Sequence, residues 1–167
     1  MTNQGKIYCL DSNVLIQAWQ KYYSPKLCPS YWEKLNQLGS EGKIFISKMV
    51  FDELTKTDDD LSKWVREGNI EVKKLTADVT NAVSQIYAAD PMHKFLVENK
   101  KGRSLADPWV IAHAIVDKAI VVTKEEKVTA ANNKKGLKIP NVCDNMSIPW
   151  MTDFDMLNDL EITFACK

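Results

Sequence analysis

The chain has 167 residues and a formal net charge of zero, with 22 basic and 22 acidic residues. This length suits one domain with a core of its own, so we predict a single domain over residues 1–167. A neutral chain has no global field to hold a polyanion, and any contact with nucleic acid must come from local groups. The four cysteines form no CxxC pair, and we expect neither a signal peptide nor a membrane span, because residues 1–6 lack an apolar h-region and no later apolar run is long enough. These features favour reduced thiols in a cytoplasmic protein that does not enter a membrane.

The first predicted element is a buried strand over residues 7–10, which ends at Asp11. Four apolar or aromatic residues in a row are too few for a helix and are typical of a strand buried on both faces. A helix capped by Ser12 or Asn13 is predicted to follow. At the end of such a strand, Asp11 would lie where open α/β sheets bind their ligands. A simple N-cap role for Asp11 is an equally good interpretation of this stretch.

Residues 20–32 contain two prolines, and their aromatic residues are interleaved with lysines. We predict a loop whose rings close over the core. Ser30 and Glu33 have the spacing of a capping box, which predicts a helix through Leu38 that Gly39 and Gly42 stop. Stacking of nucleic-acid bases is the alternative role for the rings of this region, namely Tyr22, Tyr23 and Trp32.

A second strand is predicted over residues 43–47, followed by a short helix that Ser47 caps. Glu53 lies beside the apolar stripe of that helix, so its side chain need not face bulk water. A solvated glutamate is the ordinary alternative. In residues 57–67 the run of three aspartates is predicted to cap a helix and not to bind a metal, because consecutive helical residues face different directions.

A third strand is predicted over residues 69–75, and a longer helix from Ala77 to about Pro91. Residues 119–122 predict another short buried strand, which ends at Thr123. A strand that ends in a hydroxyl group and is followed by acids repeats the pattern found at Asp11.

Between these strands, Ser104 and Asp107 have capping-box spacing, and Pro108 fits the first turn of a buried helix. Asp107 could serve only as the acid of that box. In the tail, residues 137–143 predict a fifth strand, placed at an edge because Pro140 cannot donate to a ladder. Thr152 is predicted to cap a last helix.

The alternation of strands and helices predicts an α/β fold with a parallel sheet of about four or five strands. If the acids near its edge converge, they require a cation, because like charges in one site raise one another's pKa. Oxygen-only ligands favour Mg²⁺ or Mn²⁺. Such a site indicates metal-assisted hydrolysis of a phosphodiester bond. The acids concerned are Asp11, Glu53, Asp107 and Glu125.

Four segments, in this order and spacing, resemble the four sequence blocks of the PIN domain family. They are DSNVLI at 11–16, FDEL at 51–54, LADPWVIAHA at 105–114 and VVTKEE at 121–126. The resemblance implies a Rossmann-like three-layer α/β/α sandwich with a central parallel sheet. It also implies a homodimeric, metal-dependent endoribonuclease, often the toxin of a toxin–antitoxin pair with a separate antitoxin protein.

The resemblance also implies roles for individual residues. Its metal-binding acids match Asp11, Glu53 and Asp107, and its polar residues beside the metals match Asn13 and Thr123. The family usually has an aspartate where this chain has Glu125, which is the expected fourth metal-binding acid, with Glu126 as the alternative.

Several basic residues close to these blocks are predicted to contact RNA phosphates, although solvated charges are the common alternative. They are Lys100, Lys101, Arg103 and Lys124. A catalytically silent PIN-like module that binds RNA or a protein is a second hypothesis. A phosphatase that uses Asp11 as nucleophile is a weaker third hypothesis, because Asn13 stands where the second aspartate of that motif would be.

Overall fold

The computed structural model describes residues 5–98, 105–127 and 137–165. Within these residues lies a five-stranded sheet with the order β3-β2-β1-β4-β5, in which every neighbouring pair of strands is parallel. This confirms the predicted parallel sheet. Its strands are β1 (Tyr8–Leu10), β2 (Ile44–Ser47), β3 (Glu71–Lys73), β4 (Ile120–Val122) and β5 (Trp150–Met151).

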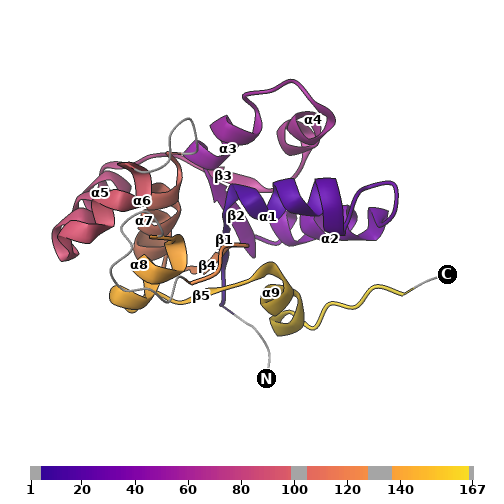
Figure 1. Cartoon of the computed structure of the whole chain (residues 1–167). Coiled ribbons are helices and arrows are strands. Elements are labelled where there is room, and N and C mark those ends of the chain that lie inside the picture. Colours follow the sequence, from indigo (N-terminus) through magenta and orange to yellow (C-terminus); the bar gives the residue numbers. More distant parts are fainter. Residues whose placement is uncertain (1–4, 99–104, 128–136, 166–167) are drawn as a thin grey trace.

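Helices cover both faces of the sheet, which confirms the three-layer α/β/α sandwich (Figure 1). Helices α1, α2 and α9 lie on one side, and α5, α6, α7 and α8 lie on the other. Parallel strands require such crossover connections. The helices are α1 (Ser12–Gln17), η1 (Ala18–Tyr22, a π-helix), α2 (Pro29–Ser40), α3 (Lys48–Leu54), α4 (Asp60–Glu67), α5 (Ala77–Ala89), η2 (Pro91–Lys94, a 3₁₀-helix), α6 (Phe95–Glu98), α7 (Asp107–Asp117), α8 (Ile139–Asn145) and α9 (Asp153–Asp159).

The central strand β1 is buried on both faces, as its apolar run predicts. Tyr8, Cys9 and Leu10 are fully buried, and β1 pairs with β2 on one side and β4 on the other. Beyond the strand, the backbone N–H of Asp11 still donates to the carbonyl of Val122 at 2.9 Å. Asp11 therefore lies at the carboxyl edge of the sheet where the strand order reverses, the usual place for a ligand in this class of fold.

Three of the predicted helix caps are present. Ser47 accepts from the N–H of Met49 at 3.2 Å, and Thr152 caps α9 through a capping box. Asp59, in the run of aspartates, caps α4. At α1 the N-cap is Asp11, as the alternative interpretation of that residue has it, and not Ser12 or Asn13.

Both ends of α2 differ from the prediction. The helix begins at Pro29 with Cys28 as its N-cap, so the capping box expected at Ser30 is absent. Gly39 lies inside the helix, which ends at Ser40. A Cβ atom on Gly39 would come within 2.6 Å of the carbonyl oxygen of Asn69. Gly39 therefore allows another backbone segment to pass close by, and it does not end the helix.

The prediction of a strand over residues 137–143 is wrong, because residues from Ile139 onward form α8. Pro140 lies in the first turn of this helix, where its missing N–H costs little. The side chain of Asn141 accepts from the N–H of Lys138 at 3.2 Å, which satisfies one more donor at the helix start. The fifth strand is β5, which pairs with Val121 and Val122 of β4.

The aromatic rings of residues 20–32 largely close over the core, as predicted. Trp32 is 4% exposed and contacts the rings of Trp19 and Trp64 edge-on. Tyr23 stacks on the buried Tyr31, with ring centroids 4.3 Å apart. Tyr22 differs from these residues, because its side chain is half exposed and it contacts Phe154 of α9.

The sequence predicts reduced cysteine thiols and no membrane-spanning segment. The described cysteines, Cys9, Cys28 and Cys143, are free thiols. In the part of the chain that the structure describes, no helix has both the length and the apolar character needed to cross a bilayer.

Candidate metal centre

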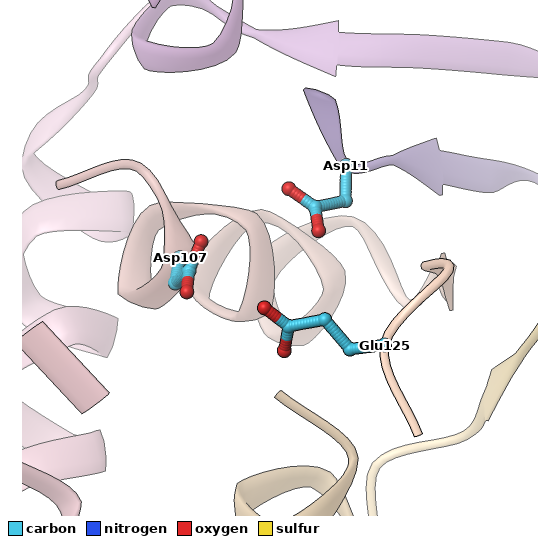
Figure 2. A group of neighbouring side chains, drawn as sticks. All are labelled: Asp11, Asp107 and Glu125. Atoms are coloured by element: carbon cyan, nitrogen blue, oxygen red, sulfur yellow. The ribbon is translucent and has the colours of Figure 1, made fainter. Parts of the chain in front are cut away.

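Three acids from distant parts of the chain meet at the carboxyl edge of the sheet. Asp11, Asp107 and Glu125 each offer one carboxylate oxygen, and these oxygens all lie within 4.8 Å of one another. Figure 2 shows their carboxylates facing a shared space, Asp11 from the end of β1, Asp107 from the start of α7 and Glu125 from the turn after β4. The structure thus brings together three of the four predicted acids. We call them the three-acid cluster.

The carboxylate of Asp11 is held by two hydrogen bonds. It accepts from the backbone N–H of Ser12 at 2.8 Å and from the hydroxyl of Thr123 at 3.0 Å. The side chain is buried, and this burial, with the charges of Glu125 and Glu53, raises the pKa of Asp11 from 3.8 to about 7. Both interpretations of Asp11 therefore hold, because it caps α1 and also belongs to an acidic site.

Asp107 reaches the cluster because α7 packs against the sheet. Helix α7 contacts β1, β2 and β4, and its residues Val110 and Ile111 are fully buried. Asp107 is the first residue of this helix and is itself buried. The N-cap is Ala106, so the capping box predicted from Ser104 is wrong. The position of Asp107 therefore depends on how the helix packs and not on a local box.

Glu125 is fixed from two sides. Its backbone N–H donates to the Thr123 hydroxyl at 3.1 Å, and its carboxylate accepts from the N–H of Ile139 at 2.9 Å. The first turn of α8 therefore holds this longer side chain over the site. Glu126 is exposed. Of the two glutamates considered for the fourth position, Glu125 lies in the cluster.

The other predicted polar residues lie around the same space. Glu53 is half-buried and lines a cavity of about 620 Å³ together with the three-acid cluster, although it is not one of the three clustered acids. Asn13 also lines this cavity, and its side-chain oxygen accepts from the backbone N–H of Lys124 at 3.0 Å. Asn13 therefore ties the start of α1 to the turn that carries Glu125.

Of the four predicted phosphate-binding residues, only Lys124 lies in the described part of the chain. The ammonium of Lys124 contacts Asp153 at 2.9 Å, and Lys124 is not among the residues that line the cavity. The remaining predicted residues lie outside the described part of the chain: Lys100, Lys101 and Arg103.

Two lysines that the sequence analysis did not consider, Lys56 and Lys138, line the cavity. Lys56 lies two residues beyond the end of α3, and only its closeness to Glu53 in the sequence could have identified it. Lys138 had no such signal, because its segment was predicted to be a strand.

The fold has counterparts among solved structures. The chain aligns with a chain from the structure of VapBC2 from Rickettsia felis bound to a DNA fragment from its promoter, with a TM-score of 0.53, 21% identity, and coverage of 87% of this chain and 98% of that chain. VapBC-1 from nontypeable Haemophilus influenzae gives a TM-score of 0.51, 19% identity, and coverage of 87% and 97%. At this identity the likeness establishes the fold, and it confirms the resemblance to PIN domains at that level.

Sequence comparison identifies the family. No curated protein matches the chain significantly. One family model, described as a domain of unknown function, DUF4411, matches residues 8–164 and so spans all five strands and the whole three-acid cluster. The chain belongs to the DUF4411 family.

Proposed function

We propose that this protein is a Mg²⁺- or Mn²⁺-dependent endoribonuclease that hydrolyses phosphodiester bonds in RNA. The observation that carries the proposal is the three-acid cluster of Asp11, Asp107 and Glu125 at the carboxyl edge of a PIN-like sheet. Ligand sites in open α/β sheets occur at this edge, where the order of strands reverses. The cluster also opens into a cavity of about 620 Å³, which leaves space for a substrate.

The residues present fit a hard divalent cation. All three donors are carboxylate oxygens, and these atoms lie within 4.8 Å of one another. Oxygen donors of this kind favour Mg²⁺ and Mn²⁺ over softer metals. Burial and the nearby charge of Glu125 raise the pKa of Asp11, and a bound cation would offset this cost of ionisation. We assign Asp11, Asp107 and Glu125 as the residues that would hold the metal, with Glu53 as a further acid at the cavity wall.

The residues around the cluster would orient these ligands and the RNA. The Thr123 hydroxyl and the Ser12 N–H fix the Asp11 carboxylate, and the Ile139 N–H fixes that of Glu125. When bound, the metal would supply positive charge to the phosphate and activate a water molecule for hydrolysis. Basic residues would hold the RNA phosphates: Lys56 and Lys138 in the cavity wall, with Lys100, Lys101 and Arg103 as predicted further contacts.

The proposal also includes a protein partner and a biological role. Both similar structures are VapBC assemblies. We therefore propose that this protein acts as the toxin of a type II toxin–antitoxin pair, with a protein antitoxin as its partner in the cytoplasm and with a homodimeric assembly. Co-expression with the product of a neighbouring gene, followed by purification and mass measurement, tests both the partner and the stoichiometry.

RNA cleavage is the direct test of the nuclease. Protein freed of any co-purifying partner would be incubated with a mixed RNA substrate in Mg²⁺, in Mn²⁺ and in excess EDTA. We expect cleavage that EDTA abolishes and that Asp11→Asn lacks. Lys43→Met serves as a control, because the Lys43 side chain is about half exposed and the residue precedes β2 at the opposite edge of the sheet.

The same assay separates the alternative. Cleavage that survives in Asp11→Asn would contradict the assigned site. Absence of cleavage in every metal by folded protein, combined with retained binding of RNA or of a partner by both proteins, would favour the catalytically silent PIN-like module.

A further inference from the structure

A buried ion pair lies next to the three-acid cluster. The ammonium of Lys124 contacts a carboxylate oxygen of Asp153 at 2.9 Å, and the two side chains are only 7% and 1% exposed. Asp153 is the first residue of α9 and lies two residues after the end of β5, so the pair joins the β4 and β5 ends of the sheet edge. Charged side chains are rarely buried to this extent unless they are paired.

Two aromatic rings enclose the lysine. Its ammonium lies 4.1 Å from the centre of the Tyr22 ring and 3.9 Å from that of Phe154. These rings meet edge-on, with centroids 5.7 Å apart. Tyr22 is the last residue of the π-helix η1, which continues α1 beyond the residues at the site. Short π-helical turns often occur at functional sites, where they redirect side chains.

The enclosed lysine stands between two residues that serve the cluster. Thr123 donates to Asp11, and Glu125 is one of the three acids. The backbone N–H of Lys124 donates to Asn13 at 3.0 Å. The turn 123–125 is therefore held through each of its residues, and Lys124 provides the contact with α9.

A buried ion pair is weak evidence for stability, because the cost of removing two charges from water offsets their attraction. Apolar residues of similar volume often serve stability as well or better. In some proteins buried polar or ionic groups are kept because they select one conformation. Here the charged atoms define one direction for the Lys124 side chain, and so one conformation for the turn.

We propose that the Lys124–Asp153 pair, enclosed by Tyr22 and Phe154, is a positioning device that holds the turn 123–125 so that the carboxylate of Glu125 faces Asp11 and Asp107. Lys124 and Asp153 act through Glu125 and do not themselves contact the substrate. The proposal rests on the proposed nuclease function only for its activity measurement, because the geometry of the turn can be measured independently.

The test uses the full chain and the double variant Lys124→Met, Asp153→Leu, which removes both charges and leaves the net charge unchanged. The matched control is Lys43→Met, Glu41→Gln, which removes an exposed pair with a 3.0 Å contact. Three quantities are compared: amide hydrogen exchange of residues 121–127, Mn²⁺ affinity by calorimetry, and kcat and KM for RNA cleavage. Thermal unfolding verifies that each variant is folded.

We expect the double variant to unfold at the same or a higher temperature than the natural chain. Its amides in the turn should exchange about tenfold faster or more, and Mn²⁺ affinity and kcat should each fall roughly tenfold, as for other residues that orient metal ligands. The control should change none of these. A folded double variant with unchanged exchange and unchanged Mn²⁺ affinity would overturn the proposal.

The outcomes separate the two proposals. If the natural chain cleaves no RNA but the exchange and Mn²⁺ results are as expected, the nuclease proposal fails and the positioning device stands. If the natural chain binds no Mn²⁺ either, hydrogen exchange alone decides.

A second variant, Tyr22→Leu with Phe154→Leu, removes the rings and leaves both charges. It provides the decisive comparison if the first variant does not fold. It also separates positioning from phosphate binding by Lys124: uncovering a phosphate-binding lysine would lower KM, whereas loosening the turn should lower kcat and speed amide exchange. A lower KM with unchanged kcat and exchange would overturn the proposal.

Discussion

The ends of β1 and β2 are built alike but carry different chemistry. Each strand runs directly into a helix, and in each case the residue at the junction is the N-cap. Asp11 accepts from the N–H of Ser12 at 2.8 Å, and Ser47 accepts from the N–H of Met49 at 3.2 Å. The two side chains are 1% and 0% exposed. One junction therefore buries a carboxyl group where the other buries a neutral hydroxyl group.

The comparison shows that the fold does not require an acid at such a junction. Ser47 caps its helix without the cost of burying a charge, whereas burial raises the pKa of Asp11 to about 7. A buried charge is unfavourable unless it is paired or binds a metal. The carboxyl group of Asp11 is therefore better explained by the chemistry of the three-acid cluster than by capping.

The largest effect on RNA cleavage is expected when Asp11 is replaced by serine, the residue found at the β2 junction. Asp11→Ser should keep a capping oxygen but remove the carboxylate, so RNA cleavage should fall by roughly 100-fold or more, since even residues that only orient metal ligands cost 10–100-fold. Metal-free protein at pH 8 should be as stable as the natural chain or more so. A variant that still cleaves would show that Asp11, like Ser47, is only a cap.

The buried carboxyl group of Asp11 should make stability depend on pH, whereas the hydroxyl group of Ser47 should not. The pKa of Asp11 is about 7 in the folded chain and is ordinarily 3.8, so between these values the folded state binds more protons than the unfolded state. The free energy of unfolding of metal-free protein should therefore fall as pH rises from about 4 to about 7, by on the order of a few kcal/mol.

Urea unfolding at a series of pH values measures this slope. Asp11→Asn should lack the contribution of Asp11, and Mg²⁺ should stabilise the natural chain more at pH 8 than at pH 5. Parallel pH profiles for the natural chain and Asp11→Asn would contradict the prediction.

Asp11 is held by a hydroxyl group, that of Thr123, whereas in the described part of the chain the Ser47 side chain bonds only to the backbone N–H of Met49. Thr123→Val removes the donor to Asp11 and the acceptor of the Glu125 N–H. We expect Mn²⁺ affinity to fall roughly tenfold, with a loss of about 1–3 kcal/mol of stability. Calorimetry and urea unfolding test this, with Thr80→Val on the surface of α5 as control. Unchanged Mn²⁺ affinity would rule out a role for Thr123 in orienting Asp11.

The smallest effect is expected at the neutral junction. Ser47→Ala removes only a cap, so stability should fall by about 1 kcal/mol while RNA cleavage is unchanged. Ser84→Ala, at an exposed position inside α5, is the control and should stay within about 0.5 kcal/mol of the natural chain. A large loss of cleavage in Ser47→Ala would mean that the two junctions are functionally alike after all.

Local features of this protein could be predicted from its sequence because their causes are local. The apolar run of residues 7–10 and the caps at Ser47 and Thr152 depend on neighbouring residues, and all are present. The predictions failed where a residue suits two environments. Pro140 is acceptable in an edge strand and in the first turn of a helix, and only the pairing of β5 with β4 decided between them.

The acids of the candidate site divide in the same way. The sequence by itself determined that Asp11 and Glu125 follow buried strands, because strand ends can be recognised from composition. Only the tertiary structure decided that Asp107 joins them while Glu53 stays at the cavity wall, because α7 packs across three strands. It alone decided that Lys124 is enclosed beside Asp153, since β5 brings these residues together. Such contacts join segments far apart in the chain, and no local pattern encodes them.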